Sequence, residues 1–176
     1  MTVGSNYIIK ICLLGEANVG KTSLVYRFIE NKFRMNYKST LGVNLLKKDT
    51  NFEEYGNVSA QIWDLGGQES FRSLRKLYLE GANGALVIYD CTNRSSYEKL
   101  EDWILDFKEA RGDEPLLLIG NKDDLTDSIK VQESEGIELA KSHNMEFMPT
   151  SAKTGSNVES AFNEIIKRIL KKKLEE

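Results

Sequence analysis

The chain has 176 residues, enough for one compact domain with its own core and too few for two ordinary domains, so we expect residues 1–176 to form a single domain. Hydrophobic residues make up 40% and charged residues 29%, which is typical of a globular protein and excludes a disordered one. The net charge of −3 argues against the cationic surface that nucleic acid requires, and we expect no nucleic-acid partner.

Short apolar runs alternate with longer segments of helical spacing, which is the pattern of a parallel sheet covered by helices on both faces. Nearly continuous apolar runs predict buried central strands at 7–14, 85–90 and 116–121. More polar runs predict an antiparallel edge hairpin at 45–50 and 58–64, and an opposite edge strand at 145–150. The sequence therefore predicts an α/β fold with a six-stranded, mostly parallel sheet that has one antiparallel edge strand.

Apolar residues at three- and four-residue spacing predict five helices around this sheet. The helices are expected at 21–30, 69–79, 97–110, 131–143 and 156–174. No window approaches the ~18 uninterrupted apolar residues of a membrane span, and no secretion signal is visible. Cys12 and Cys91 lie inside apolar runs, where a small buried side chain is their simplest role. These features indicate a cytoplasmic protein.

The first motif lies between the first predicted strand and the first predicted helix. Residues 15–22, GEANVGKT, match G-x-x-x-x-G-K-[ST], whose backbone N–H groups cradle a polyphosphate at a helix N-terminus. Lys21 would bridge phosphate oxygens, and the Thr22 hydroxyl would bind Mg²⁺. A chance glycine turn at a helix start is the simpler alternative. The residues expected to contact nucleotide here are Gly15, Glu16, Ala17, Asn18, Val19, Gly20, Lys21, Thr22 and Ser23.

A second motif closes the strand predicted at 58–64. Asp64 ends that strand, where its carboxylate can reach Mg²⁺, and Leu65-Gly66-Gly67-Gln68 follows it. The Gly67 N–H is placed to bind a γ-phosphate, and Gln68 is placed to orient an attacking water molecule. The alternative is an ordinary Gly-Gly turn at a strand end.

A third motif predicts which base the bound nucleotide carries. Asn121-Lys122-Asp123-Asp124 follows an apolar strand, at the carboxyl edge where ligands of α/β sheets bind. Asp124 can accept two hydrogen bonds from guanine, whereas adenine would leave both partners unpaired. Ser151, Ala152 and Lys153 follow the last strand, and the Ala152 N–H would bind the guanine carbonyl. Alone, the string at 121–124 would more often be a polar turn, and the tripeptide at 151–153 is uninformative. After a phosphate loop, the set indicates guanine.

With these motifs in this order, the chain from about 7 to 170 resembles the small GTPases of the Ras superfamily, most closely the Rab branch. Further Rab-like sequence is QESFRSL at 68–74, YDCTN at 89–93 and GNKDDL at 120–125. The segment WDLGGQ at 63–68 looks more like the Arf branch or the septum-initiation GTPases of fungi. The resemblance implies the three-layer fold of the P-loop NTPases.

The resemblance also implies roles for further residues. Phe33 should lie against the guanine edge, Tyr37 should cover the phosphates, and Thr40 should bind Mg²⁺ through its hydroxyl. Lys122 should pack along the base, and Asn121 should tie the base loop to the phosphate loop. Plain hydrophobic packing is the alternative for Phe33 and Tyr37. The implied metal ligands are Thr22, Thr40 and, through a water molecule, Asp64.

The implied activity is hydrolysis of GTP to GDP and phosphate with Mg²⁺, with Gln68, Lys21 and Thr40 as catalytic residues. No arginine is placed at the γ-phosphate by sequence, so we expect slow turnover that an activating protein raises. Loops near 34–42 and 66–77 would be held by GTP and released after hydrolysis. We expect a monomeric switch with effectors, an exchange factor and a GTPase-activating protein, in intracellular trafficking or signalling.

Two features concern partners. Rab proteins usually present an aromatic residue, a tryptophan and a second aromatic residue on their effector surface. By the resemblance, the matching positions here are Leu45, Trp63 and Tyr78, so Leu45 departs from that pattern and Rab partners do not carry over directly. Residues 167–176 contain no cysteine for a lipid anchor, so either the protein takes no lipid or the sequence ends before its anchor. The lysines at 171–173 can contact anionic lipid, although a solvated helix end is the simpler role, so membrane contact is expected to be peripheral at most.

Two other functions compete with a hydrolytic switch. A nucleotide-bound scaffold would use the same fold only as an interaction surface, but Gln68 and Thr40 argue against it. A metabolic P-loop kinase would need an acceptor pocket and a lid, and no insertion in the sequence provides them.

Overall fold

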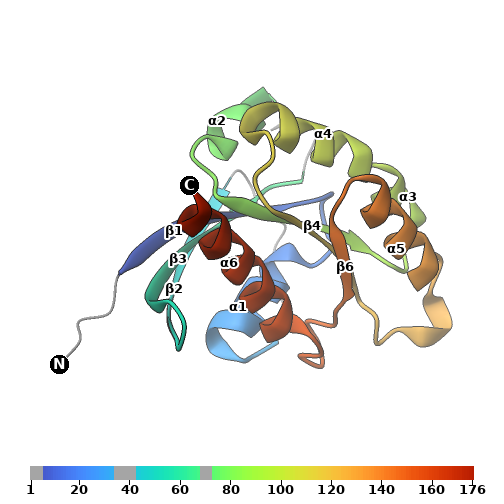
Figure 1. Cartoon of the computed structure of the whole chain (residues 1–176). Coiled ribbons are helices and arrows are strands. Elements are labelled where there is room, and N and C mark those ends of the chain that lie inside the picture. Colours follow the sequence, from blue (N-terminus) through green and yellow to red (C-terminus); the bar gives the residue numbers. More distant parts are fainter. Residues whose placement is uncertain (1–5, 34–42, 68–72) are drawn as a thin grey trace.

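A computed structural model describes residues 6–33, 43–67 and 73–176 (Figure 1). Its six strands form one sheet in the order β2-β3-β1-β4-β5-β6. Only β2 runs antiparallel to its neighbour, since the other pairs are all parallel. The predicted fold class is therefore confirmed. The strands are β1 (Tyr7–Leu14), β2 (Val43–Phe52), β3 (Gly56–Leu65), β4 (Gly84–Asp90), β5 (Leu116–Asn121) and β6 (Glu146–Pro149).

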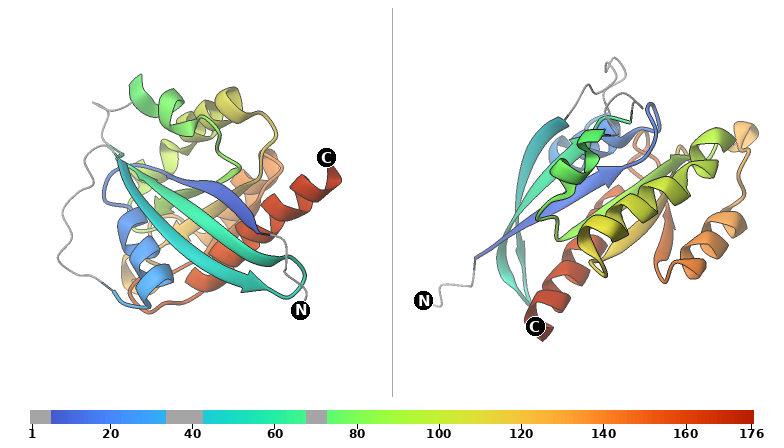
Figure 2. Two further views of the ribbon diagram at one scale, coloured as in Figure 1. Left: turned by 90° about the vertical axis from the view of Figure 1, so that its left-hand side faces the viewer. Right: turned by 90° about the horizontal axis from the view of Figure 1, so that it is seen from above.

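The sequence of each strand reflects its place in the sheet. Every residue of β4 and of β5 is buried, because both strands are central and covered by helices on both faces. In β2 exposed residues alternate with less exposed ones, as expected for an edge strand with one wet face. Figure 2 shows β2 and β3 as a long hairpin at that edge.

The helices cover the two faces of the sheet in two groups (Figures 1 and 2). One apolar core joins the sheet to α1 and α6, and a second core joins its other face to residues of α2, α4 and α5. The helices are α1 (Lys21–Glu30), α2 (Arg75–Leu79), α3 (Arg94–Glu98), α4 (Leu100–Arg111), α5 (Glu133–Ser142) and α6 (Val158–Glu175). With α3 and α4 taken as one helix interrupted at Lys99, these are the five predicted helices.

Helix boundaries differ from the predicted ones where polar caps decide them. The helix expected from residue 97 begins at Arg94, because the Asn93 side chain accepts a hydrogen bond from the Ser96 N–H. The helix expected from residue 131 begins at Glu133, where Gln132 and Glu135 form a reciprocal capping box. The described part of α2 begins at Arg75, and residues 68–72 of the predicted helix lie outside the described residues.

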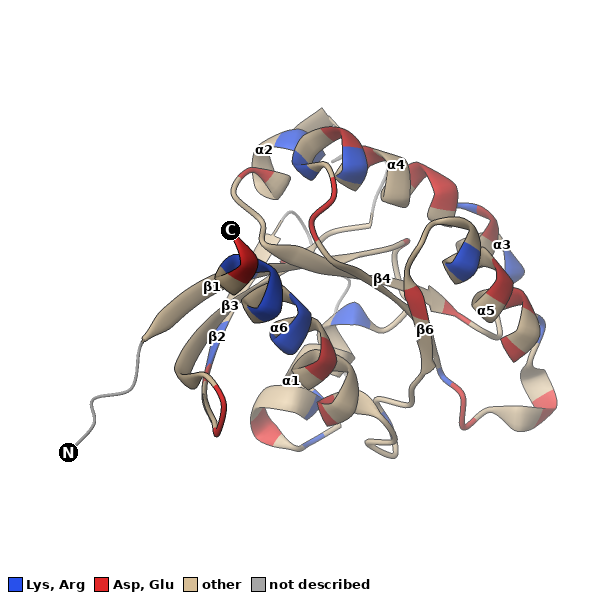
Figure 3. Ribbon diagram, in the orientation of Figure 1, with Lys and Arg blue, Asp and Glu red and all other residues tan. Residues whose placement is uncertain are grey.

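The charged residues lie mainly on the helices and loops, while the central strands are largely uncharged (Figure 3). Among the described residues, no helix is both long enough and apolar enough to cross a membrane. Both cysteines are buried and unpaired, and burial raises the pKa of the Cys12 thiol to about 12. Cys12 therefore remains a neutral thiol at physiological pH.

Parallel pairing places the functional loops together. Strands β1, β3, β4, β5 and β6 are linked by parallel pairs, so their carboxyl ends meet at one edge of the sheet. In an open α/β sheet this edge is where ligands bind. The loops that follow β1, β3, β5 and β6 carry the three predicted motifs and the Ser-Ala-Lys segment.

Candidate functional site

The loop between β1 and α1 has a backbone that side chains would obstruct. Gly15 and Gly20 have φ angles of 144° and 100°. A Cβ atom on Gly15 would lie 2.1 Å from the Ile88 carbonyl oxygen, and one on Gly20 would lie 2.3 Å from Asn121 Nδ2. Both positions therefore require glycine. The loop ends at the N-terminus of α1, where no side chain caps the helix and its first N–H groups can bind an anion.

Lys21 folds back over this loop. Its Nζ donates to the carbonyl oxygens of Gly15 and Glu16, at 2.8 and 2.9 Å, and the residue is only 5% exposed. Burial lowers the pKa of Lys21 to about 8, against the opposing effects of the Asp64 and Glu16 carboxylates. A buried ammonium at a helix N-terminus is strongly attractive to an anion such as phosphate.

A hydroxyl and a carboxylate meet beside the loop. Thr22 Oγ1 donates to Asp64 Oδ2 at 2.5 Å, and Asp64 is fully buried at the end of β3. These are hard oxygen ligands of the kind that Mg²⁺ prefers. The described residues contain no cluster of three or more His, Cys, Asp or Glu side chains that could hold a metal. The Thr22 hydroxyl and the Asp64 carboxylate fit Mg²⁺, which is commonly bound by one or two protein oxygens and takes the others from phosphate and water.

Gly67 brings the second motif against the first. A Cβ atom at this residue would lie 2.2 Å from the Ala17 nitrogen and 2.4 Å from the Glu16 carbonyl carbon. The backbone after β3 thus lies directly on the phosphate loop, and only glycine permits this approach.

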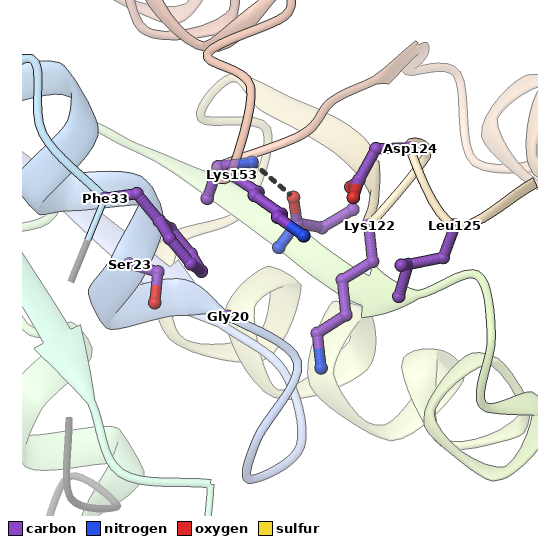
Figure 4. Close-up of a pocket in the computed structure, with 9 residues that line it drawn as sticks. Gly20, Ser23, Phe33, Lys122, Asp124, Leu125 and Lys153 are labelled. Carbon is purple, nitrogen blue, oxygen red and sulfur yellow. Dashed lines mark hydrogen bonds between the residues drawn. The ribbon is translucent and has the colours of Figure 1, made fainter. Parts of the chain in front are cut away.

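A pocket of about 290 Å³ opens beside the loop (Figure 4). Its size is at the lower end of the range for small-molecule sites. In the close-up, Phe33 and Asp124 project from opposite sides, and Lys122 extends along one wall. The lining residues are Gly20, Ser23, Phe33, Asn121, Lys122, Asp124, Leu125, Ala152 and Lys153.

Asn121 holds the pocket together from beneath. Its Nδ2 donates to the Val19 carbonyl oxygen at 2.9 Å, which joins this loop to the phosphate loop. Its Oδ1 accepts from Thr150 Oγ1 at 3.0 Å and from the Ala152 N–H at 3.3 Å. The Ala152 N–H, which we predicted to bind the guanine carbonyl, donates to Asn121 here. Asn121 is 1% exposed, so all these partners are buried with it.

The neighbouring charged residues are also fixed. Asp124 Oδ1 accepts from Ser151 Oγ at 2.8 Å, which orients the carboxylate at the pocket wall. Lys122 has a positive φ of 66°, and its Nζ donates to the Asn18 carbonyl oxygen at 2.9 Å. The same ammonium pairs with Asp90 Oδ2 at 2.9 Å. The Lys122 side chain is therefore stretched from the pocket to the phosphate loop.

The structure brings together most of the predicted site. One edge of the sheet holds the phosphate loop, Asp64, Gly67, the 121–124 loop, the 151–153 loop and Phe33. Three predicted residues lie outside the described part of the chain, namely Tyr37, Thr40 and Gln68.

Comparison with known proteins agrees with this architecture. The family model described as "Ras family" matches residues 10–171. This chain belongs to the Ras family. Among its relatives are Ras-related protein Rab-13 from Canis lupus familiaris, 36% identical, with 98% of this chain and 85% of the relative covered. Rab-11A from Dictyostelium discoideum is 39% identical, with 93% and 77% covered, and RABA1c from Arabidopsis thaliana is 39% identical, with 93% and 76% covered. The predicted Rab-like resemblance is confirmed, and the protein is a small GTPase.

Two residues of this Ras-family site were missed by sequence reasoning. Asp90 ends β4 and pairs with Lys122, and an acidic residue at the carboxyl end of an apolar strand was an available signal. Trp103 lies in α4, and its Nε1 donates to Glu16 Oε1 at 2.9 Å. No sequence signal marked this contact, because helical spacing shows that Trp103 faces the core but not which loop it reaches.

Proposed function

We propose that this Rab-like small GTPase binds GTP and GDP with Mg²⁺, hydrolyses GTP to GDP and phosphate, and cycles between a partner-binding and a released state. The observation that carries the proposal is the hydrogen bond from Asn121 to Val19, which joins the pocket to the phosphate loop at one sheet edge. A nucleotide spans two such subsites, with its base in the pocket and its phosphates over the N-terminus of α1.

Guanine selection would rest on Asp124. Ser151 already donates to Asp124 Oδ1, which keeps the carboxylate at the pocket wall and available to the N1–H and amino group of guanine. Phe33 and the Lys122 stem would enclose the base from its two sides, as their places in the pocket suggest. Adenine would present a lone pair to the carboxylate and bind poorly.

The hydroxyls of Thr22 and Thr40 and the Asp64 carboxylate would hold Mg²⁺, in keeping with the closeness of Thr22 to Asp64. When bound, Mg²⁺ neutralises charge on the β- and γ-phosphates. Lys21 would place its ammonium on the same phosphates, exchanging its present carbonyl partners for phosphate oxygens.

The remaining residues would position the reactants. Gly67, already against the phosphate loop, would donate its N–H to the γ-phosphate, and Gln68 would orient the attacking water molecule in line with the leaving oxygen. No covalent intermediate is required. Without an arginine at the γ-phosphate we expect turnover on the order of 10⁻⁴ to 10⁻³ per second, as in Ras, until a partner protein supplies one.

Regulation would follow from the loops near 34–42 and 66–77, which GTP holds and hydrolysis releases. Effectors, an exchange factor and a GTPase-activating protein would read or drive that change, in trafficking or signalling. We further propose that residues 1–176 are one G domain that acts as a cytoplasmic monomer, with at most peripheral membrane contact. The last turns of α6 are blue in Figure 3, just before its red end, and the exposed Lys171 and Lys173 would make that contact.

Single-turnover phosphate release tests the hydrolytic proposal. Protein loaded with GTP should release phosphate slowly, and Gln68→Leu should lower this rate by at least about tenfold, because the water loses its orienting group. Gln61→Leu, at an exposed position of β3, is the matched control and should hydrolyse like the wild type. Equal, near-zero rates of phosphate release in the wild type and in Gln68→Leu would indicate a nucleotide-bound scaffold and would contradict the proposed GTP hydrolysis.

A further inference from the structure

Trp103 contacts two elements that the proposed cycle treats separately. It lies in α4 and is 1% exposed. Its indole N–H reaches the phosphate loop, where Nε1 donates to Glu16 Oε1 at 2.9 Å. Its ring face is covered by α2, since the guanidinium carbon of Arg75 lies 3.3 Å from the ring centroid. One side chain therefore links the phosphate loop to the helix that follows the Gly67 segment.

Glu16 places a carboxylate in the loop proposed to bind phosphate, where its charge would repel that group if it faced the site. The hydrogen bond to Trp103 turns this carboxylate toward α4, which covers the sheet face opposite α1. The Glu16 backbone, in contrast, belongs to the phosphate site. Its carbonyl oxygen accepts from Lys21, and the Gly67 backbone lies against it. The side-chain bond thus helps set the position of a backbone segment that two proposed phosphate contacts share.

The Arg75 guanidinium is buried between the indole and one acidic partner. It is 4% exposed, and its one ion pair, among the described residues, is with Asp106 at 3.0 Å. Its Nε–H is buried with no hydrogen-bond partner in the described part of the chain. The stack on Trp103 and the pair with Asp106 are therefore the two contacts that tie the guanidinium of this α2 residue to α4. Figure 1 shows α2 and α4, the helices that carry these two residues, beside each other.

We propose that Trp103 is a positioning residue for nucleotide binding, which keeps the Glu16 carboxylate away from the phosphates and couples the packing of α2 to the phosphate loop. The inference rests on the proposed function, because it concerns how tightly that site holds guanine nucleotide. It has two consequences. Loosening Arg75 on α2 speeds nucleotide release, and exchanging GDP for a GTP analogue changes the surroundings of the indole.

Release of fluorescently labelled GDP and of a labelled, non-hydrolysable GTP analogue tests the first consequence. Trp103→Phe keeps an aromatic ring but removes the N–H, and it should release nucleotide about tenfold faster, the effect of one lost hydrogen bond to a charged group. Arg75→Lys keeps the charge for Asp106 but not the planar stack, and it should release nucleotide a few-fold faster. Glu109→Gln is the control, since it removes only the exposed Lys76–Glu109 pair between the same helices and should match the wild type.

If Trp103 and Arg75 had only a structural role, the fold-changes in release rate of the two single variants would multiply in the double variant. The release rates of GDP and of the GTP analogue would then change by the same factor. A positioning role predicts that nucleotide release from the double variant is accelerated by less than the product of the two single-variant factors. It also predicts that the ratio of the GDP release rate to the GTP-analogue release rate changes. In Trp63→Phe, where Trp103 is the one remaining tryptophan, emission should shift on exchange of GDP for the analogue. Arg75→Lys in that background should reduce the shift.

The outcomes separate the inference from the proposed function. Wild-type protein that binds neither labelled nucleotide contradicts the proposed function. Wild-type protein that binds both, with Trp103→Phe and Arg75→Lys releasing them at its own rate, contradicts the positioning role alone. If Trp103→Phe does not fold, Arg75→Lys and the emission of Trp63→Phe decide the matter, and an unchanged release rate with unchanged emission overturns the inference.

Discussion

Asn121 donates to the carbonyl oxygen of Val19 at 2.9 Å, although 102 positions separate the two residues in the chain. The bond joins the loop after β5 to the loop after β1, and it is buried. The bond therefore ties the pocket to the loop of residues 15–22, so the two proposed subsites are not independent of each other. Nucleotide affinity should depend on this bond even though Asn121 need not touch phosphate.

Asn121→Ala should weaken both the fold and the site. The variant leaves the Val19 carbonyl and the Thr150 hydroxyl without their buried partner, which should lower the free energy of unfolding by about 1–3 kcal/mol. The dissociation constant for GDP should rise by at least about tenfold. Thermal unfolding and nucleotide titration measure the two effects. Asn51→Ala, which removes an exposed bond to Asn57, is the control and should change neither quantity.

Gly67→Ala tests the close approach of the second motif. The added methyl would collide with the backbone of Ala17 and Glu16, so the segment must move away from the phosphate loop. A displacement of about 1 Å is enough to slow hydrolysis by about a hundredfold, with GDP affinity much less affected. Gly112→Ala separates this effect from simple backbone strain. Gly112 has a φ of 61° but open space around it, so its variant should lose stability while hydrolysing GTP normally. Equal hydrolysis by Gly67→Ala and the wild type would contradict the assigned approach.

Lys21 makes nucleotide binding depend on pH. Burial lowers the pKa of Lys21 to about 8, from an ordinary value of 10.5, and bound phosphate should raise it again. Above pH 8, binding should therefore take up a proton, and affinity should fall as the pH increases. The free energy of unfolding depends on pH with the opposite sign. Between about pH 8 and 10.5 the unfolded chain holds the extra proton, so Lys21 makes the nucleotide-free protein more stable as the pH rises.

Calorimetry in two buffers of different ionisation heat measures that proton. At about pH 9 the binding heats should differ between the buffers, and at about pH 7 they should agree because Lys21 is already charged. The control is Lys21→Met, provided that it binds GDP. This variant should retain any proton uptake by the guanine base and should lose the uptake that Lys21 contributes. Equal heats in both buffers at about pH 9 would show that the pKa of Lys21 is not lowered.

Asp90 should affect the rate of GDP dissociation through its ion pair with Lys122. Asp90→Asn removes the charge that the Lys122 ammonium faces at 2.9 Å, in a pair where the Asp90 side chain is only 8% exposed. The lysine should then hold its extended position less well, and GDP should dissociate a few-fold faster, since such a pair is worth more than an exposed one. Stopped-flow release of labelled GDP measures this. Asp49→Asn disrupts a pair in which both side chains are mostly exposed and should release GDP at the wild-type rate.

Much of the fold could be predicted from local pattern. The predicted bounds of β1, α1 and β5 match the structure, because a nearly continuous apolar run or a glycine-rich start marks each of them. The start at Arg94 could not be predicted from apolar spacing, because it depends on the polar cap of Asn93. Hydrophobic periodicity records which face is buried and says little about where a helix begins.

The candidate site divides in the same way. The glycines of the phosphate loop and the residues after β5 were predictable, because close backbone approach and base recognition demand particular residue types at fixed spacing. The contacts of Asp90 with Lys122 and of Trp103 with Glu16 were not, because they join side chains whose nearness arises only from packing. Tyr37, Thr40 and Gln68 lie outside the described residues, and their roles stay predictions.

The central claim is that the site holds guanine nucleotide, and the most direct measurement is chromatography of whatever the purified, denatured protein releases. The account predicts GDP or GTP, in an amount close to one per chain. Asp124→Ala, which removes the base-reading carboxylate, should be purified with much less of it. Release of an adenine nucleotide, or of no nucleotide by a wild-type protein that also fails to bind added GDP, would contradict the account.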